Sequence, residues 1–200
     1  GRAYESSREE PMSDSKTIAI VGDSKGIGAA LREQLLAAGH RVIGVSRSGV
    51  QREGAGTADY QSLVFDAVTH PCDLSGFAEH LDGLVYCPGT IRLKPLKGLK
   101  KDVALEDWNV NAWGAAQTLQ TNFPLLQKSE QASVVLFSTV AVQTGMPFHA
   151  SIAMAKGAVE GLTRSLAAEW SPKIRVNAIA PSLTDTPLAS GLLGSDAKKE

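Results

Sequence analysis

The stretch that most constrains the fold lies between residues 16 and 40. "KTIAIVG" (16–22) is a short β-branched run that ends in glycine, which is typical of a buried strand. "GIGAALREQLLAAGH" follows with leucine and alanine at helical spacing, and Gly39 marks the expected end of that helix. A buried strand that leads through glycines into a helix favours a βαβ unit in a parallel sheet.

The same alternation of strand and helix continues along the chain. Further strands are expected at 41–47, 60–66, 81–89, 133–139 and 174–181. Helices are expected over 105–127, bent or ended near Pro124, and over 151–170. This order predicts an α/β fold: a Rossmann-type doubly wound, mostly parallel sheet with helices on both faces. We expect residues 1–12 to be a leader or disordered tail and residues 13–200 to be a single domain.

Composition narrows the class of protein. With 43% hydrophobic and 20% charged residues, the chain is expected to be one soluble globular domain. The net charge of −1 gives no reason to expect nucleic acid or an anionic membrane as a partner, and no apolar run is long enough to span a bilayer. Cys72 and Cys87 lack metal-ligand spacing, so we expect free thiols, no metal site and a cytoplasmic location.

The stretch "VGDSKGIG" has the character of a phosphate-binding loop. Its three glycines permit a tight turn, let the backbone approach a pyrophosphate, and let the helix lie close to the sheet. The helix amino terminus then offers free N–H groups to the anion. An ordinary turn is the alternative. The predicted loop residues are Gly22, Ser24, Lys25, Gly26, Ile27 and Gly28.

Two cations indicate which dinucleotide this loop would bind. Lys25 lies inside the loop, and Arg47 ends the second strand, where the adenosine ribose would lie. A site that prefers NAD(H) usually has Asp or Glu there, but "VSRS" contains no acid. The guanidinium of Arg47 suits a 2′-phosphate, which favours NADP(H) over NAD(H). The alternative is that both are solvated surface cations.

The glycine loop, "LDGLVYCPG", Asn111, "FSTVA", Lys156 and "IRVNAIAP" occur in an order that resembles the short-chain dehydrogenase/reductase family, over about residues 16–190. The resemblance implies hydride transfer between a nicotinamide and a small-molecule carbonyl or alcohol. It also implies a homodimer or homotetramer through the helices that bear Asn111 and Lys156. The further cofactor contacts that it implies are Asp66, Gly89, Lys156 and Thr186.

The chain departs from the family pattern in several places. Where the family has Asn-Asn-Ala-Gly, residues 86–89 read Tyr-Cys-Pro-Gly, and Ser182 replaces a glycine. The family usually continues beyond the point at which this sequence stops. We therefore expect the domain to lack the usual C-terminal helix and last strand.

Family catalysis uses an asparagine, a serine, a tyrosine and a lysine. The resemblance assigns the asparagine to Asn111, the serine to Thr139 with Ser138 beside it, and the lysine to Lys156. The tyrosine position, four residues before the lysine, is Ile152. Isoleucine cannot transfer a proton, so the usual general acid is missing.

Two hypotheses follow from the missing tyrosine. In the first, the protein is an atypical NADP(H)-dependent oxidoreductase whose proton comes from His149, from water or from the substrate; the alternative for His149 is a loop histidine satisfied by water. In the second, it is a catalytically inactive NADP(H)-binding homologue, a sensor or assembly partner. Ile152 extends an apolar helical stripe, whereas Lys156 lies outside that stripe, and a ribose contact would explain the lysine.

Overall fold

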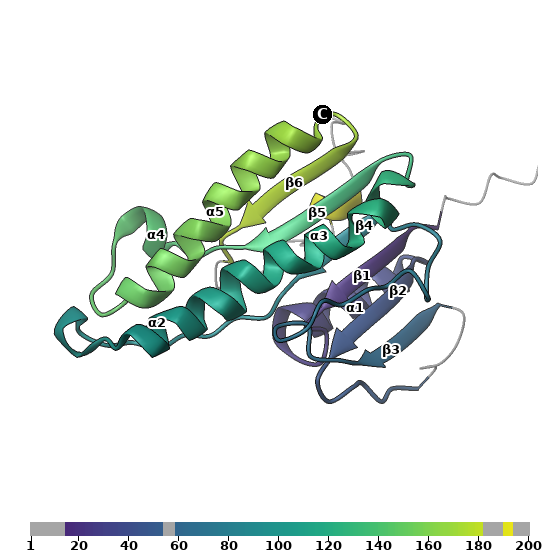
Figure 1. Ribbon diagram of the computed structural model, residues 1–200. Coiled ribbons are helices and arrows are strands. Elements are labelled where there is room, and N and C mark those ends of the chain that lie inside the picture. The colour runs from purple at the N-terminus through teal and green to yellow at the C-terminus, as the bar shows by residue number, and fades with distance from the viewer. Residues whose placement is uncertain (1–14, 54–58, 182–189, 194–200) are drawn as a thin grey trace, which may run out of the picture.

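The computed structural model describes residues 15–53, 59–181 and 190–193 (Figure 1). The predicted leader and Thr186 lie outside the described residues. Within them, six parallel strands form one sheet in the order β3-β2-β1-β4-β5-β6, so the predicted fold class is confirmed. The strands are β1 (Thr17–Val21), β2 (Arg41–Ser46), β3 (Tyr60–Val64), β4 (Gly83–Tyr86), β5 (Ala132–Phe137) and β6 (Ile174–Ile179).

Helices cover both faces of the sheet (Figure 1). The main helices are α1 (Gly26–Ala37), α2 (Lys101–Trp108), α3 (Gly114–Gln127) and α5 (Ala150–Trp170). Shorter elements are the 3₁₀ turn η1 (Leu96–Gly98), the π-helical turn η2 (Asn109–Trp113), α4 (Ala141–Thr144) and α6 (Ser190–Leu193). Buried side chains of α3 and α5 form one core cluster with the sheet, whereas those of α1 and α6 belong to a second cluster.

The helix predicted over 105–127 begins earlier, at Lys101, and continues through Pro124. Its regular bonding is interrupted instead at η2, where Tyr86 from β4 meets the helix. The Tyr86 hydroxyl donates a hydrogen bond to the Val110 carbonyl at 2.5 Å. A Cβ at Gly114 would overlap that hydroxyl, so only glycine at this position lets the Tyr86 ring come this close to the helix. The π-helical turn thereby gives the Val110 carbonyl a partner outside the helix.

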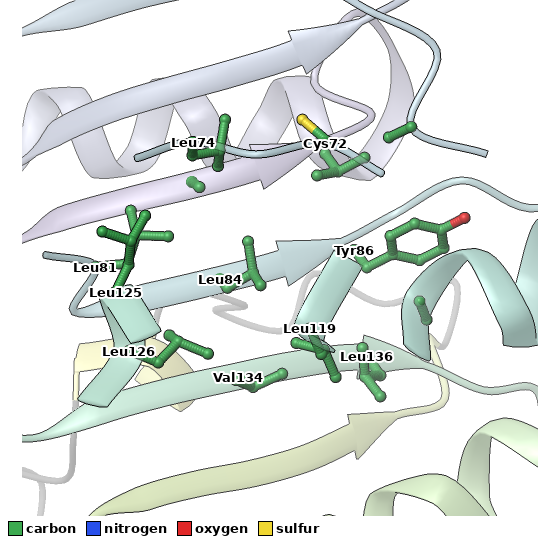
Figure 2. Packing of buried hydrophobic residues seen from close by; sticks show 14 of the residues in the cluster. Cys72, Leu74, Leu81, Leu84, Tyr86, Leu119, Leu125, Leu126, Val134 and Leu136 are labelled. Carbon is green, nitrogen blue, oxygen red and sulfur yellow. The ribbon is translucent and has the colours of Figure 1, made fainter. Parts of the chain in front are cut away.

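The predicted alternation of strand and helix is wrong between β3 and β4. Residues 65–82 form turns and extended chain, yet Cys72, Leu74 and Leu81 are buried in the same cluster as α3 (Figure 2). Asn122 of α3 satisfies this backbone: its amide donates to the Cys72 carbonyl at 2.7 Å and accepts from the Leu74 N–H at 3.0 Å. A buried asparagine thus replaces the backbone partners that a helix would have supplied.

Candidate functional site

A cleft of about 1130 Å³ opens at the carboxyl ends of the strands, where doubly wound sheets bind ligands. We call it the strand-end cleft. Its walls come from the turns that follow β1 to β4 and from the helix that contains η2. The structure brings together on this cleft nine residues predicted for cofactor binding: Gly22, Ser24, Lys25, Gly26, Ile27, Gly28, Arg47, Asp66 and Gly89.

The glycine loop has the geometry that an anion site needs. Gly22 and Gly26 have φ values of +87° and +60°, in the left-handed region that favours glycine. A Cβ at Gly28 would overlap the Gly22 carbonyl oxygen, so the helix could not lie this close to the loop with a side chain there. No side chain caps the amino terminus of α1. Its N–H groups and helix dipole are therefore available to a phosphate.

Charged side chains surround this loop on the cleft. Lys25 and Arg47 are exposed on its wall, and neither forms an ion pair within the described residues. Asp66 lies in the turn after β3, where its carboxylate accepts hydrogen bonds from the N–H groups of Val68 at 3.1 Å and Thr69 at 3.4 Å. The turn backbone therefore fixes the Asp66 side chain on the cleft wall.

Asn111 and Lys156 meet at Gly89. A Cβ at Gly89 would lie 3.0 Å from Asn111 Oδ1 and 3.7 Å from Lys156 Nζ. Asn111 Nδ2 donates to the Asp107 carbonyl at 2.8 Å and to Thr90 Oγ1 at 3.2 Å, whereas its buried Oδ1 has no partner. Burial lowers the pKa of Lys156 to about 8. An unpaired buried oxygen beside a partly desolvated amine is a site that a ligand hydroxyl would complete.

None of the predicted catalytic residues is itself a lining residue of the strand-end cleft; Asn111 and Lys156 approach it at Gly89, whereas Ser138, Thr139 and His149 have other surroundings. The Ser138 hydroxyl donates to Glu160 of α5 at 2.9 Å, and Thr139 Oγ1 accepts from the Ala141 N–H at 3.4 Å. His149 immediately precedes α5, and its Nδ1 lies 2.7 Å from the Pro147 carbonyl oxygen. Ser138 and Thr139 follow β5 at the same edge of the sheet as the glycine loop, but their hydroxyls are engaged elsewhere.

Ile152 is a packing residue in this structure. Its side chain is 3% exposed and follows Ser151 at the start of α5. Ala155 and Val159, farther along the same stripe, are equally buried, so the predicted apolar face of the helix is confirmed. The side chain at position 152, where the family resemblance predicted the catalytic tyrosine, therefore carries no group that could transfer a proton.

The sequence prediction missed a polar cluster next to Asn111. Asp107 is fully buried and accepts hydrogen bonds from Thr90 Oγ1 at 2.5 Å and Ser151 Oγ at 2.6 Å. Thr90 lines the strand-end cleft, whereas Asp107 lies behind it. The available sequence signal was the spacing: Asp107 precedes Asn111 by one helical turn, and Thr90 directly follows Gly89.

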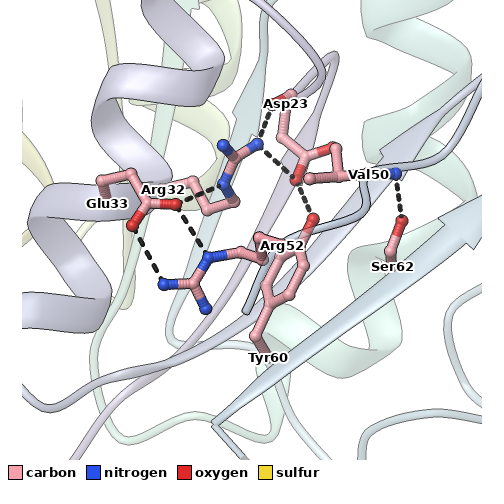
Figure 3. Close-up of polar contacts among 7 residues, drawn as sticks. All are labelled: Asp23, Arg32, Glu33, Val50, Arg52, Tyr60 and Ser62. Atoms are coloured by element: carbon pink, nitrogen blue, oxygen red, sulfur yellow. Dashed lines mark hydrogen bonds and ion pairs between the residues drawn. The ribbon is translucent and has the colours of Figure 1, made fainter. Parts of the chain in front are cut away.

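A second buried carboxylate, Asp23, belongs to the glycine loop itself (Figure 3). Its Oδ2 accepts the Tyr60 hydroxyl at 2.5 Å and lies 3.5 Å from the Arg32 guanidinium, which also donates to the Asp23 carbonyl. Burial raises the pKa of Asp23 and, together with the bond to Asp23, raises that of Tyr60 to about 12. Glu33 and Arg52 extend this network to the surface.

Comparison with known proteins identifies the family. A family model described as enoyl-(acyl carrier protein) reductase matches residues 21–200. A tropinone reductase homologue of Arabidopsis thaliana is 32% identical over 98% of this chain and 78% of its own length. Another from the same plant is 33% identical over 90% of this chain and 74% of its own length.

Solved structures show the same architecture. Thermoplasma acidophilum aldohexose dehydrogenase is 26% identical, with a TM-score of 0.74 over 92% of this chain and 74% of that one. A short-chain dehydrogenase from Shigella flexneri, solved with NADP, shares the fold at 24% identity, with a TM-score of 0.74 over 89% of this chain and 81% of its own.

The chain therefore belongs to the short-chain dehydrogenase/reductase family of oxidoreductases. Enzymes of this family bind NAD(H) or NADP(H) and act on small molecules. In the part of the chain that the structure describes, no helix is both long and apolar enough to cross a membrane. Those same residues contain no cluster of metal-binding side chains.

Proposed function

We propose that this chain is an NADP(H)-dependent oxidoreductase that interconverts a small-molecule carbonyl compound and its alcohol. Its proton donor is a group other than the residue at position 152. The observation that carries the proposal is the convergence of Asn111 Oδ1 and Lys156 Nζ at Gly89, on the edge of the cleft that the glycine loop lines. An unpaired buried amide oxygen at Asn111 and a partly buried amine at Lys156 would lower the stability of the fold unless a ligand satisfied them.

The residues present fit a nicotinamide dinucleotide. The uncapped terminus of α1 would hold the pyrophosphate, and the unpaired oxygen of Asn111 and the amine of Lys156 would hold polar groups near the nicotinamide. Arg47 and Lys25 favour a 2′-phosphate because both are unpaired, exposed cations on the wall of the cleft. When bound, the nicotinamide supplies or accepts the hydride.

The residues of the chain itself would bind the cofactor, orient the substrate and exchange a proton with it. A charged Lys156 would donate to ribose hydroxyls, and Asn111 would accept a hydrogen bond from a ligand or a bound water through Oδ1. Without a tyrosine at position 152, we expect proton transfer to be about 10²–10⁴-fold slower than with one. The protein would thus be a slow enzyme with an ordinary cofactor site.

A non-catalytic NADP(H)-binding sensor or assembly partner is the second candidate. Ile152 is apolar and only 3% exposed, so it offers no accessible proton donor, which favours this candidate. The two candidates share one cofactor site and differ only in turnover. We favour the enzyme because Asn111, Thr139 and Lys156 all occupy positions that the family resemblance assigns to catalysis.

Binding followed by turnover separates these candidates. NADPH is titrated against the protein by fluorescence, and consumption of NADPH is then followed with 2,3-butanedione, benzaldehyde and cyclohexanone. We expect saturable binding and slow turnover of at least one carbonyl. Binding with no turnover would favour the non-catalytic candidate, and failure to bind either dinucleotide would contradict both.

Restoring the tyrosine tests the geometry inferred for the site. In Ile152→Tyr, we expect carbonyl reduction to rise by about 10²-fold because a phenol regains the position of the general acid. Ile152→Phe is the matched control, since it adds the ring without the hydroxyl. If Ile152→Tyr binds NADPH but gains nothing over Ile152→Phe, the arrangement of Asn111 and Lys156 proposed here is wrong.

Cofactor preference is tested at Arg47. Replacing it with aspartate places a carboxylate where a 2′-phosphate would bind, and we expect about a 10–100-fold preference shift from NADPH towards NADH. Arg52→Asp is the control, because Arg52 is paired with Glu33 and does not line the cleft. Equal NADPH affinity in Arg47→Asp and the unmodified protein would remove Arg47 from the phosphate site.

We also propose that the protein forms a homodimer or homotetramer through the helices that bear Asn111 and Lys156. These helices expose apolar side chains: Leu105, Trp108, Trp113 and Met154 are each more than 40% exposed, and the two tryptophan rings stack at 6.0 Å. Sedimentation of the protein and of Met154→Glu tests this. We expect the substitution to shift the equilibrium towards monomer, and a monomeric unmodified protein would contradict the proposal.

A further inference from the structure

The strand-end cleft contains one wall hydroxyl that is backed by a buried carboxylate, at Thr90. Its Oγ1 donates to Asp107 Oδ1 at 2.5 Å, and Thr90 lies on the cleft wall. Asn111 Nδ2 donates to the same Oγ1 at 3.2 Å. Thr90 follows Gly89 directly, so this hydroxyl lies beside the point where Asn111 and Lys156 converge.

Asp107 differs from a structural carboxylate in its partners. It is fully buried, and within the described ranges it forms no ion pair. Its partners are the hydroxyls of Thr90 and, at 2.6 Å, Ser151. The nearby Arg92 is paired with Glu106 at 2.7 Å on the exposed rim. A buried carboxylate whose side-chain donors are two hydroxyls, with the nearby cation paired to another carboxylate, is costly, and such carboxylates concentrate at functional sites.

We propose that Thr90 and Asp107 form the proton-transfer pair that serves this site in place of the missing tyrosine. Thr90 is the catalytic residue, because it lines the cleft and its hydroxyl donates to the carboxylate of Asp107. Asp107 acts through Thr90 as its proton acceptor and donor, and Ser151 holds the second carboxylate oxygen. The inference rests on the proposed oxidoreductase function and names the proton donor that this function requires.

The proton steps balance in both directions. When an alcohol is oxidised, its O–H proton passes to Thr90 Oγ1, and the proton of Thr90 passes to the Asp107 carboxylate. The substrate carbon loses a hydride to the oxidised nicotinamide dinucleotide, which is the co-reactant, and a C=O bond forms. In reduction, the carbonyl carbon gains the hydride and its oxygen gains the Thr90 proton. The Asp107 carboxyl then returns its proton to Thr90. The short Thr90–Asp107 contact supports transfer along this path.

The structure favours this pair over His149, the residue that sequence spacing suggests. His149 does not line the cleft, and its Nδ1 is held against the Pro147 carbonyl. A general acid must come within hydrogen-bond reach of the proton that it transfers. Thr90 is on the cleft wall, whereas His149 directly precedes α5 and does not line the cleft.

The test compares Thr90→Val, Thr90→Ser and Asp107→Asn in two backgrounds, the unmodified protein and Ile152→Tyr. The carbonyl used is whichever of 2,3-butanedione, benzaldehyde and cyclohexanone the unmodified protein reduces fastest. In the unmodified background, we expect Thr90→Val and Asp107→Asn to lower kcat by about 10²-fold or more, and Thr90→Ser to keep most of it. In the Ile152→Tyr background, Thr90→Val should lower kcat by less than about 3-fold, because the phenol now transfers the proton.

Two measurements separate proton transfer from a structural role. The Kd for NADPH, titrated by fluorescence, should stay within about 2-fold in all variants, and the ligand-free proteins should melt cooperatively. Thr163→Val and Asp82→Asn are the matched controls. Thr163 bonds its own helix at Val159, and Asp82 takes the Ser129 hydroxyl at the opposite end of the strands. Neither residue lines the cleft, so both should keep kcat.

Each failure has a distinct signature. If the unmodified protein turns over and Thr90→Val leaves kcat unchanged, the Thr90–Asp107 inference is overturned while the proposed function stands. If NADPH binds, Ile152→Tyr turns over and the unmodified protein does not, both are overturned. If Thr90→Val fails to bind NADPH or lowers kcat equally in both backgrounds, Thr90 has a structural role and the inference is again wrong.

Discussion

Asp23 and Asp107 are both fully buried, and each accepts a hydroxyl at 2.5 Å, yet their surroundings differ. Asp23 is part of the glycine loop and has a cation, Arg32, at 3.5 Å. Asp107 accepts hydrogen bonds from two hydroxyls and forms no ion pair within the described residues; one of these hydroxyls belongs to Thr90, which lines the strand-end cleft. A carboxylate compensated by arginine can hold a loop in place, whereas one that depends on hydroxyls is poised to exchange a proton. We therefore expect Asp23 to serve stability and Asp107 to serve chemistry.

The largest expected effect is the loss of stability in Asp23→Ala. The substitution leaves Arg32, which is 8% exposed, without its carboxylate, and we expect the free energy of unfolding to fall by about 3–5 kcal/mol. Urea unfolding measures it. Arg52→Ala, on the exposed rim of the same network, should cost less than about 1 kcal/mol. The double variant Asp23→Ala/Arg32→Met should recover part of this stability, because it also removes the buried charge left unpaired. A double variant less stable than Asp23→Ala alone would contradict the stabilising role assigned to the Asp23–Arg32 pair.

The next effect comes from crowding around the Asp23 carboxylate. A Cβ at Gly44 of β2 would overlap that carboxylate, so Gly44→Ala must displace the whole network. We expect a loss of about 1–3 kcal/mol in urea unfolding, typical of an overpacked core. Gly157→Ala is the control, since a Cβ there meets no atom within 4 Å. Equal stability of the two variants would show that the Asp23 network tolerates movement.

Removing one hydroxyl from each carboxylate sharpens the comparison further. Tyr60→Phe and Thr90→Val should each cost about 1–2 kcal/mol in urea unfolding, because each deletes one hydrogen bond to a buried carboxylate. Only Thr90→Val should also lower turnover. A Tyr60→Phe variant that keeps its stability but loses turnover would reverse the roles assigned to the two carboxylates.

The order of elements and the glycine loop could be predicted from the sequence because both depend on local patterns. Short apolar runs, helical spacing and glycines determine the six strands, the long helices and the turn at Gly22. The loop over 65–82 could not be predicted, because its backbone is satisfied by Asn122, a residue distant in sequence. For the same reason Asp107 was missed: Thr90 and Ser151 reach it only after the chain has folded.

A further expected effect concerns two cations, Arg32, which is buried, and Lys156, which is partly buried. Arg32 has Asp23 as a partner, whereas Lys156 forms no ion pair within the described residues, and burial lowers its pKa from 10.5 to about 8. Between pH 8 and 10.5 the unfolded chain therefore binds more protons at Lys156 than the folded protein does. The charged lysine destabilises the fold fully below about pH 8, and this penalty disappears as pH rises towards 10.5.

Ligand-free Lys156→Met should accordingly be more stable than the unmodified protein at pH 7. Its advantage should shrink as pH rises from about 8 towards 10.5, because the unmodified protein then sheds its buried charge. Urea unfolding across this range measures the difference, and Lys173→Met, an exposed lysine after α5, is the control. An advantage that does not depend on pH would mean that Lys156 is solvated as an ordinary surface lysine. The proposed difference between Arg32, which is paired with Asp23, and Lys156, which forms no ion pair within the described residues, would then be wrong.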